Sequence, residues 1–236
     1  QELSDFANTL MELPQTHPLA RLLGESPDFR SKAGLADALL NPQDRSYTVP
    51  QLLQWITEAG LRFGRWVRQA PYLPQCSPFV QTPHRLRLMQ LPEYEQYAAI
   101  ELLRGTMLRH NLIVYHPHDS GGDTRSNEGS QIHFQGNEWL DYIPIRLPET
   151  VCVNDRLPPG AEAVLINQSH TDSDIYLSID GVEKRLYDAI DGKRSIINIL
   201  ENIMTDHESA RRFFERLWRY DQVVFDASNW RNLDGF

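Results

Sequence analysis

The residues best suited to recognition chemistry lie in the basic, proline-broken stretch RWVRQAPYLPQC, from Arg65 to Cys76. Arg65 and Arg68 supply guanidinium groups, Tyr72 a phenol and Gln75 an amide, and the prolines between them stiffen the backbone. Loops held on a rigid frame are common sites of binding. The sequence therefore predicts that Arg65, Arg68, Tyr72 and Gln75 contact a substrate or a catalytic domain. The alternative is that the same residues only pack a junction between domains.

Two histidines in the sequence His116-Pro117-His118 follow a β-rich run, a spacing at which both imidazoles can point to one side. A zinc site needs a third and usually a fourth ligand, and no such residue stands at a suitable spacing. Two solvated histidines at the end of a strand are the favoured interpretation, and no metal is predicted.

Cys76 and His84 are near enough in sequence to suggest a nucleophile and its base, but no third group that would orient the base is identifiable. With no CxxC pair, Cys76 and Cys152 are expected to be ordinary buried thiols. The carboxylates Glu93, Glu95 and Glu101 are distributed around one expected helix and are predicted to face water. No catalytic residue is therefore assigned.

The composition limits the classes of partner. The chain has 236 residues, 41% of them hydrophobic, with a formal net charge of -9. An acidic surface disfavours general binding to nucleic acid or to anionic membranes. No apolar run reaches the roughly 18 residues that a membrane span needs, and the first ten residues are too polar for a signal peptide. A cytoplasmic location is expected.

The first half of the chain predicts mostly helices. Apolar spacing indicates helices over 3–13, 49–59, 84–91 and 93–108, and β-rich runs indicate strands over 61–67 and 112–115. Thr48 is placed to cap the second of these helices, Pro50 suits its first turn and Gly60 ends it. The abrupt start suggests that the chain is a fragment of something longer. Residues 119–130 are polar and glycine-rich, as in a flexible linker.

The second half predicts short strands followed by helices. Strands are expected over 139–146, 151–153, 163–166, 175–179 and 223–225, and helices over 182–190, 196–203 and 207–220. Three helices followed by a strand are typical of a winged-helix unit. The last helix carries arginines, but aromatic residues lie between them, so a protein or peptide contact is favoured over DNA. The complete chain is predicted to be α-rich α+β, with a helical domain followed by a winged-helix-like domain.

Four segments of the first half, read together, carry a family resemblance. They are LPQTHPLARLL (13–23), LADALLNPQDRSYTVPQLL (35–53), AGLRFGRWVRQAPYLPQC (59–76) and ELLRGTMLRHNLIVY (101–115). With them the chain, from about Asp5 to Tyr115, resembles the C-terminal portion of a bacterial group of class I S-adenosylmethionine-dependent methyltransferases.

The resemblance implies that 61–67 and 112–115 are the last two strands of a methyltransferase sheet, an antiparallel pair whose edge was made for other strands. Alternatively, this region is an independent helical domain that sits beside the catalytic one, and this second interpretation is slightly favoured because residues 1–118 are rich in helix. In such enzymes a glycine-rich turn and an acidic residue hold the cofactor, and this chain has neither, since its only Gly-Gly pair, Gly121-Gly122, lies in the expected linker. No cofactor-binding residue is carried over; S-adenosylmethionine is expected only in the parent enzyme.

The run IDGVEKRLYDAIDGKRSIINIL (179–200) is more faintly similar to the winged-helix-like domains of the PqqD type, which bind leader peptides. A plain structural winged-helix cap fits the same residues.

These expectations combine into one hypothesis. Residues 1–118 form a helical, methyltransferase-associated regulatory domain, 119–130 a flexible linker and 131–236 a winged-helix-like domain. The chain serves as an accessory, regulatory or substrate-docking region of a methyltransferase and is not catalytic alone. Its expected partners are the catalytic domain and a peptide or protein substrate. The alternative is a peptide- or protein-binding winged-helix module, with DNA binding less favoured.

Overall fold

The computed structural model describes residues 2–17, 19–20, 23, 27–43, 45–76, 82–105, 107, 109–116, 132–170 and 172–228. The chain divides into two compact units, residues 1–47 and 48–236. Helices combine with several small antiparallel sheets, which confirms the predicted α-rich α+β class. Within the described ranges, no helix has the length and apolar character to cross a membrane.

The first unit is helical. Helices α1 (Glu2–Met11) and α3 (Lys32–Leu40) pack together, and a 3-10 turn at Pro27–Arg30 precedes α3. Leu10 of α1 and Leu35 of α3 are its buried residues. Ser31 caps α3 by accepting the N–H of Gly34 at 3.0 Å, a bond that satisfies one of the free amides of the first turn.

Helix α4 (Val49–Glu58) opens the second unit as its sequence predicts. Thr48 is its N-cap residue, and its N–H donates to Gln51 Oε1 at 3.0 Å, the reciprocal bond of a capping box. Beyond the helix, Gly60 adopts φ +73°, a left-handed conformation that glycine reaches without a steric cost.

Strands β1 (Arg62–Trp66) and β2 (Leu112–Tyr115) pair antiparallel, with Arg62 opposite Tyr115 and Trp66 opposite Leu112. The prediction of an antiparallel strand pair is therefore confirmed. Between the two strands run α5 (Pro83–Met89) and α6 (Glu93–Arg104). Helix α6 ends four residues earlier than predicted because Gly105 turns left-handed, with φ +60°.

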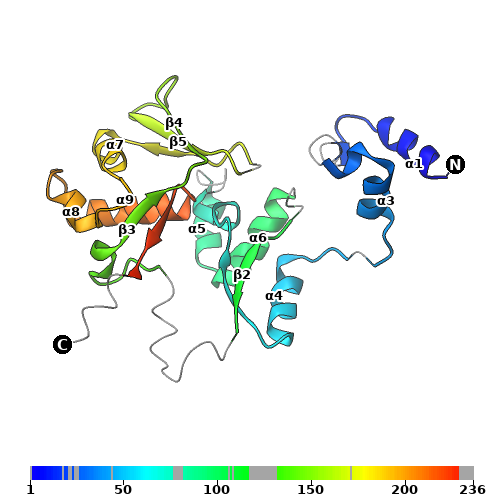
Figure 1. Cartoon of the computed structure of the whole chain (residues 1–236), viewed down its shortest axis with the longest axis horizontal. Helices are drawn as coiled ribbons and strands as arrows, with labels where there is room; N and C mark the ends of the chain where they lie inside the picture. The colour runs from blue at the N-terminus through cyan, green and yellow to red at the C-terminus, as the bar shows by residue number, and fades with distance from the viewer. Residues whose placement is uncertain are drawn as a thin grey trace. The chain divides into compact units, whose positions relative to one another are not determined.

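The C-terminal part of the second unit, residues 132–228, contains two further sheets. Strand β3 (Ile143–Arg146) pairs antiparallel with β7 (Val223–Asp226). Strands β4 (Thr150–Val153), β5 (Ala163–Asn167) and β6 (Leu177–Ile179) form a second antiparallel sheet in that order. In Figure 1, β4 and β5 lie side by side, with α7 next to them.

The strand predicted over 139–146 is wrong in its first half. Glu138–Asp141 form a 3-10 turn that buries Trp139 and Leu140, and the strand begins only at Ile143. The physical reason is that a short apolar segment with two large side chains fits a buried turn as well as an alternating strand.

Three helices follow: α7 (Gly181–Asp188), α8 (Ile196–Leu200) and α9 (His207–Arg219). Asp180 caps α7 and Asp206 caps α9 through bonds to backbone amides. The apolar faces of the three helices and the inner sides of β5 and β6 share one core, which includes Leu165, Leu186, Ile196, Phe213 and Phe214. The predicted order of strands and helices is confirmed in this part.

The linker predicted over 119–130 lies outside the described residues. The unit boundary that the structure has falls between Tyr47 and Thr48, and the described residues on both sides of the predicted linker belong to one compact unit.

Candidate functional site

The loop that follows β1, Val67–Cys76, contains most of the predicted site. Two 3-10 turns, Ala70–Tyr72 and Pro74–Cys76, shape it. Most of its residues are buried or half-buried, which is unusual for a connection on the surface. The loop therefore belongs to the core of the second unit, and each predicted site residue has to be placed from its contacts.

The four predicted residues have different surroundings. Arg65 is half-buried, with its guanidinium 5.6 Å from the ring centre of Trp218 and its Nε donating to the carbonyl of Trp66. Gln75 accepts the hydroxyl of Tyr220 on its main-chain carbonyl, at 2.7 Å. Arg68 is half-buried. Arg65 and Gln75 therefore contact the C-terminal part of the same chain, while contact with a substrate stays a prediction.

Tyr72, the fourth, is 4% exposed and lies in an aromatic cluster. Its ring stacks on the indole of Trp66, with the ring centroids 3.9 Å apart. Tyr97 of α6 meets both rings edge-on. Stacked and edge-on aromatic pairs each add roughly 0.5–1.5 kcal/mol beyond the burial of their area, so this cluster fixes the loop on α6.

The phenol of Tyr72 is the end of a hydrogen-bonded chain. Its Oη lies 2.8 Å from His110 Nδ1, and His110 Nε2 lies 3.2 Å from Glu101 Oε1. The other oxygen of Glu101 accepts the N–H of Val49, in the first turn of α4, at 2.8 Å. These hydrogen bonds thus join the loop, the segment before β2, helix α6 and helix α4.

Burial is the first cause that raises the pKa of Tyr72, and the negative charges of Glu101 and Asp172 raise it further. A phenol with a raised pKa stays protonated at neutral pH and acts as a donor, not as a base. These hydrogen bonds therefore hold segments together, and their geometry does not make Tyr72 an activated nucleophile.

Sequence reasoning placed Glu101 in water, and this is wrong. Its side chain is 14% exposed because it accepts from His110 and Val49. Glu93 accepts the hydroxyl of Tyr97 at 2.5 Å. The sequence could not show the burial of Glu101, because its partners His110 and Val49 lie outside α6 and helical spacing carries no information about them.

Arg104, at the end of α6, is a second connection to the C-terminal part. Its Nε donates to the carbonyl of Pro71 at 2.9 Å, and its Nη1 lies 3.3 Å from Asp172 and 3.2 Å from Asp174. The Arg104 side chain is only 4% exposed, so its charge depends on these carboxylates.

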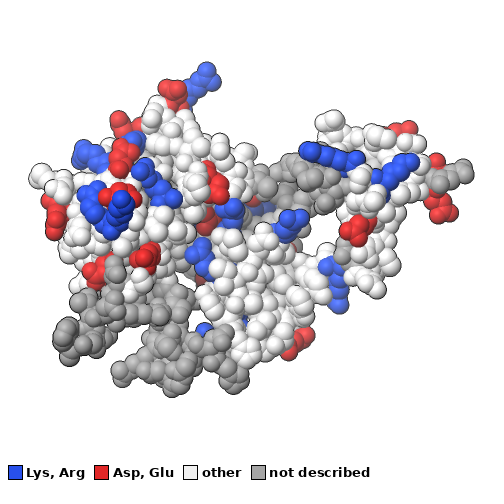
Figure 2. All heavy atoms as spheres, in the orientation of Figure 1, with Lys and Arg blue, Asp and Glu red and all other residues white. Residues whose placement is uncertain are grey.

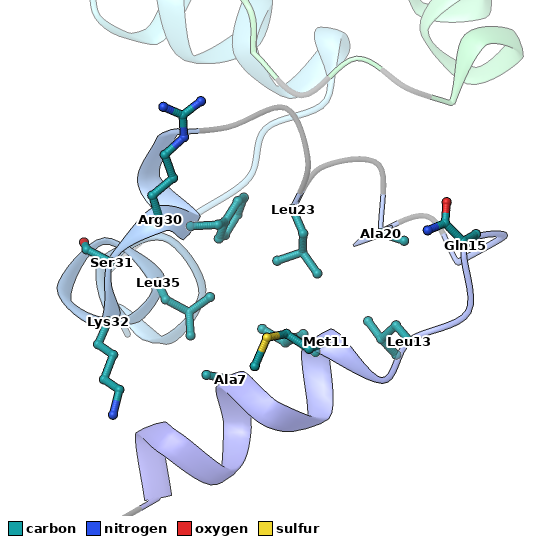
Figure 3. A pocket seen from close by; sticks show the side chains of 12 residues that line it. Ala7, Met11, Leu13, Gln15, Ala20, Leu23, Arg30, Ser31, Lys32 and Leu35 are labelled. Atoms are coloured by element: carbon teal, nitrogen blue, oxygen red, sulfur yellow. The ribbon is translucent and has the colours of Figure 1, made fainter.

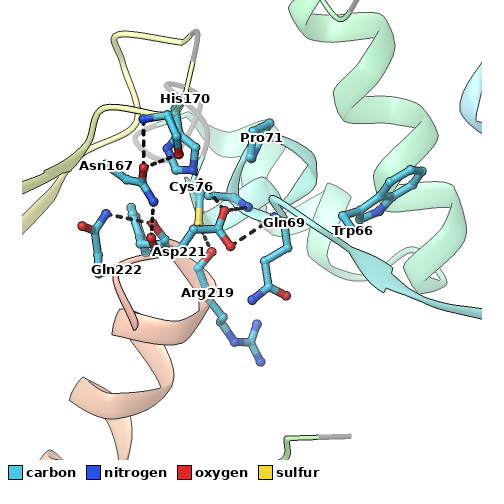
Figure 4. A network of polar contacts seen from close by, with 12 residues as sticks. Trp66, Gln69, Pro71, Cys76, Asn167, His170, Arg219, Asp221 and Gln222 are labelled. Carbon is cyan, nitrogen blue, oxygen red and sulfur yellow. Dashed lines mark hydrogen bonds and ion pairs between the residues drawn. The ribbon is translucent and has the colours of Figure 1, made fainter. Parts of the chain in front are cut away.

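Asp221 is the centre of the polar network in Figure 4. Its carboxylate accepts the N–H groups of Gln69 and Ala70 at 3.2 and 2.9 Å, and its Oδ2 lies 3.1 Å from His170 Nε2. Asn167 donates to the main-chain carbonyl of Asp221. Sequence reasoning missed Asp221 because no local pattern marks it.

The surroundings of the Cys76 thiol disfavour a nucleophile. The thiol is buried and lies 3.6 Å from the carbonyl of Arg219, an acceptor. Burial raises its pKa, and the charge of Asp221 raises it further. The thiolate that a nucleophile requires is therefore disfavoured, and a Cys76–His84 catalytic pair is not supported.

Within the described ranges, no three residues of the types His, Cys, Asp and Glu gather as metal ligands would. His118, the second member of the H-x-H pair, lies outside those ranges.

The arginines of α9 are paired with carboxylates. Arg211 bonds to Glu208, Arg219 to Glu215, and Arg216 to Glu183 of α7. On the face drawn in Figure 2, positive and negative side chains are interspersed. A phosphate backbone would have to displace these partners, so the arrangement does not favour DNA.

A cavity of about 400 Å³ lies within the first unit, between α1 and α3. Figure 3 shows Leu13, Leu23 and Leu35 around it. Among the described residues, its lining is mainly apolar, with Arg30 and Lys32 as its basic residues and no carboxylate beside them.

No protein-family model matches the chain. The assignment of function therefore depends on the residues and contacts described above.

Proposed function

We propose that this chain is an accessory region of an S-adenosylmethionine-dependent methyltransferase, which docks on the catalytic domain through the open side of β2. The cofactor belongs to the catalytic domain. The observation that carries the proposal is the contrast between the composition of β2 and its surroundings.

Strand β2 reads Leu-Ile-Val-Tyr, four apolar residues in succession. Such a run is typical of strands that are covered on both faces, whereas a strand with one face in water alternates apolar and polar residues. Yet Ile113 is 39% and Val114 is 37% exposed. Adjacent residues point to opposite faces, so both faces of β2 are incompletely covered.

The outer edge of β2 also lacks a strand partner within the part of the chain that the structure describes. Among the described residues, β1 is its one paired neighbour. A two-stranded ribbon is marginal alone, and an open apolar edge is a template for another strand. Pairing with a strand of a catalytic sheet would satisfy the edge, and the helices of that domain would cover Ile113 and Val114.

The antiparallel direction of β1 and β2 agrees with the last strand pair that the family resemblance implies. The loop Val67–Cys76 begins where β1 ends, so it adjoins the proposed interface. Arg65, Arg68 and the side chain of Gln75 remain the proposed contacts to the catalytic domain or its substrate. Tyr72 is not among them, because its phenol is already engaged with His110.

Amide hydrogen exchange tests the docking. The partner is the proposed methyltransferase catalytic domain, and the complete chain is measured with and without it. We expect slower exchange at Leu112–Tyr115 in the mixture, and no binding of S-adenosylmethionine by the chain alone. Unchanged exchange at β2 would contradict the proposal.

A specific observation also favours a second candidate, a peptide-binding module in the C-terminal part. The sheet β4-β5-β6 has two outer strands. The carbonyl of Ser178 in β6 accepts Arg216 Nη2 at 2.9 Å, whereas β4 exposes 37% of Val151. An extended peptide that adds a strand is therefore expected at β4. Chemical-shift mapping with a diverse peptide library tests it, and shifts absent from β4 would rule this candidate out.

A further inference from the structure

The loop Gln69–Cys76 is held by four consecutive residues at the end of α9. The carbonyl of Trp218 accepts Gln69 Nε2, and the carbonyl of Arg219 accepts the thiol of Cys76. The hydroxyl of Tyr220 donates to the carbonyl of Gln75. The carboxylate of Asp221 accepts the main-chain N–H groups of Gln69 and Ala70.

These contacts complete the C-terminus of α9. The last carbonyls of a helix lack partners within the helix. Two of them, from Trp218 and Arg219, accept side-chain donors of the loop. The loop thus caps α9 although it lies far away in the sequence, since Gln69 and Trp218 are 149 positions apart.

Asp221 occupies a position where glycine is the usual residue. The N–H of Asp221 donates to the carbonyl of Trp218 at 3.1 Å, and that of Gln222 to Leu217 at 2.8 Å, the two bonds of a Schellman motif. In this motif the residue after the cap is left-handed, and Asp221 has φ +52°. Aspartate tolerates this conformation better than most residues, but glycine adopts it without steric cost, so backbone preference alone does not explain an aspartate.

The hydrogen bonds of the Asp221 carboxylate explain why an aspartate stands at this position. The residue is 3% exposed, and each of its oxygens accepts one loop amide, Oδ1 from Gln69 and Oδ2 from Ala70. The imidazole of His170, whose side chain is 1% exposed, lies against Oδ2. Hydrogen bonds to a buried charged group are stronger than those to a neutral one.

We propose that Asp221 is the positioning residue of the loop Gln69–Cys76, and that it makes the conformation of this loop depend on the C-terminal part of the chain. Helix α9 and the loop then move as one body. A ligand that shifts α9 therefore also shifts the loop where it begins, at the end of β1. The functional consequence rests on the proposed function, since the loop adjoins the strand pair that docks.

The test uses amide exchange in the complete chain with two substitutions at one position. Asp221→Asn keeps the shape and the tolerance for a left-handed backbone but removes the charge. Asp221→Gly relieves the backbone strain and removes the carboxylate. Asp188→Asn is the matched control, because Asp188 is exposed and far from the loop in sequence, with its side chain paired to Lys184.

We expect Asp221→Gly to speed exchange at Gln69 and Ala70 by about tenfold or more while the amides at 221 and 222 stay protected, since the Schellman bonds remain. Asp221→Asn should speed loop exchange in the same direction, and Asp188→Asn should leave it unchanged. If Asp221 served only to end α9, Asp221→Gly would leave the loop protected or protect it more, and this result would overturn the proposal.

A second measurement tests the docking separately from the position of the loop. It is the affinity of each variant for the catalytic domain. If the wild-type chain does not bind, the proposed function fails while the exchange result still decides the role of Asp221. A different result is that the wild-type chain binds and both Asp221 variants bind equally well despite faster loop exchange. Asp221 then positions the loop, but the conformation of the loop does not affect docking, and the proposed coupling is wrong.

Discussion

The ring of Tyr72 lies parallel to the indole of Trp66, with an angle of 5° between the planes. Trp66 is the last residue of β1, and Tyr72 belongs to the first turn of the loop. The stack therefore folds the loop back on its own strand. Two hydrogen bonds then fix the loop: the phenol of Tyr72 bonds to His110 Nδ1, and the N–H of Gln69 donates to the carboxylate of Asp221.

Tyr72→Phe should destabilise the chain by about 1 kcal/mol, because it keeps the stack but removes the hydroxyl partner of His110 Nδ1. Urea unfolding followed by circular dichroism measures the change. Tyr176→Phe is the control, since Tyr176 is 47% exposed. Equal effects of the two substitutions would show that this hydrogen bond contributes nothing to stability.

Gly64→Ala should destabilise the ribbon by about 1–3 kcal/mol. A Cβ at Gly64 would collide with the ring of Tyr115 and approach the carbonyl of Ile113 to 3.0 Å. The clash arises from packing, since Gly64 has no left-handed φ. Gly181→Ala has open space around its Cβ and serves as the control in the same thermal unfolding measurement. If Gly64→Ala leaves the stability unchanged, the ring of Tyr115 moves aside without cost and the packing argument is wrong.

Alkaline pH should unfold the chain. Burial raises the pKa of Tyr72, Tyr97 and Tyr220 above the ordinary value of 10.0. A tyrosine whose pKa is higher in the folded state binds its proton more tightly there. The stability it contributes is complete below pH 10 and declines as the pH rises above it.

The measurement is a titration of phenolate absorbance together with circular dichroism. We expect the exposed tyrosines to ionise first, and Tyr72, Tyr97 and Tyr220 only as the helical signal is lost. Ionisation of all nine tyrosines in one step near pH 10, with the fold intact, would contradict the burial of these phenols.

Local chemistry explains which elements the sequence predicts well. Helix α4 follows from Thr48, Pro50 and Gly60, because caps and breakers act within one turn. Strand β2 follows from its β-branched composition. In contrast, Asp221 binds Gln69 across 152 positions, and Glu101 binds Val49 across 52. No window of sequence contains such pairs, so the residues that fix the loop could not be found from their neighbours.

The predicted site shows the same division. The position of the Arg65–Cys76 loop and its proline turns follow from composition. The direction of each side chain does not, because it depends on Trp218, Tyr220 and His110, which come from other elements. Tyr72 therefore appeared available for recognition in the sequence and is buried in the structure.

The proposed docking interface can be tested by placing a charge on β2. Val114 of β2 and Val151 of β4 are both 37% exposed and both lie in strands, so Val114→Arg and Val151→Arg are matched substitutions. A charge at the centre of an apolar interface has to be buried without a partner, whereas the same charge outside the interface remains in water.

Isothermal titration of the complete chain with the proposed partner, a methyltransferase catalytic domain, tests the central claim most directly. We predict that the wild-type chain and Val151→Arg bind with equal affinity, and that Val114→Arg binds about tenfold more weakly or worse. Absence of binding by the wild-type chain, or equal binding by all three proteins, would contradict docking through β2.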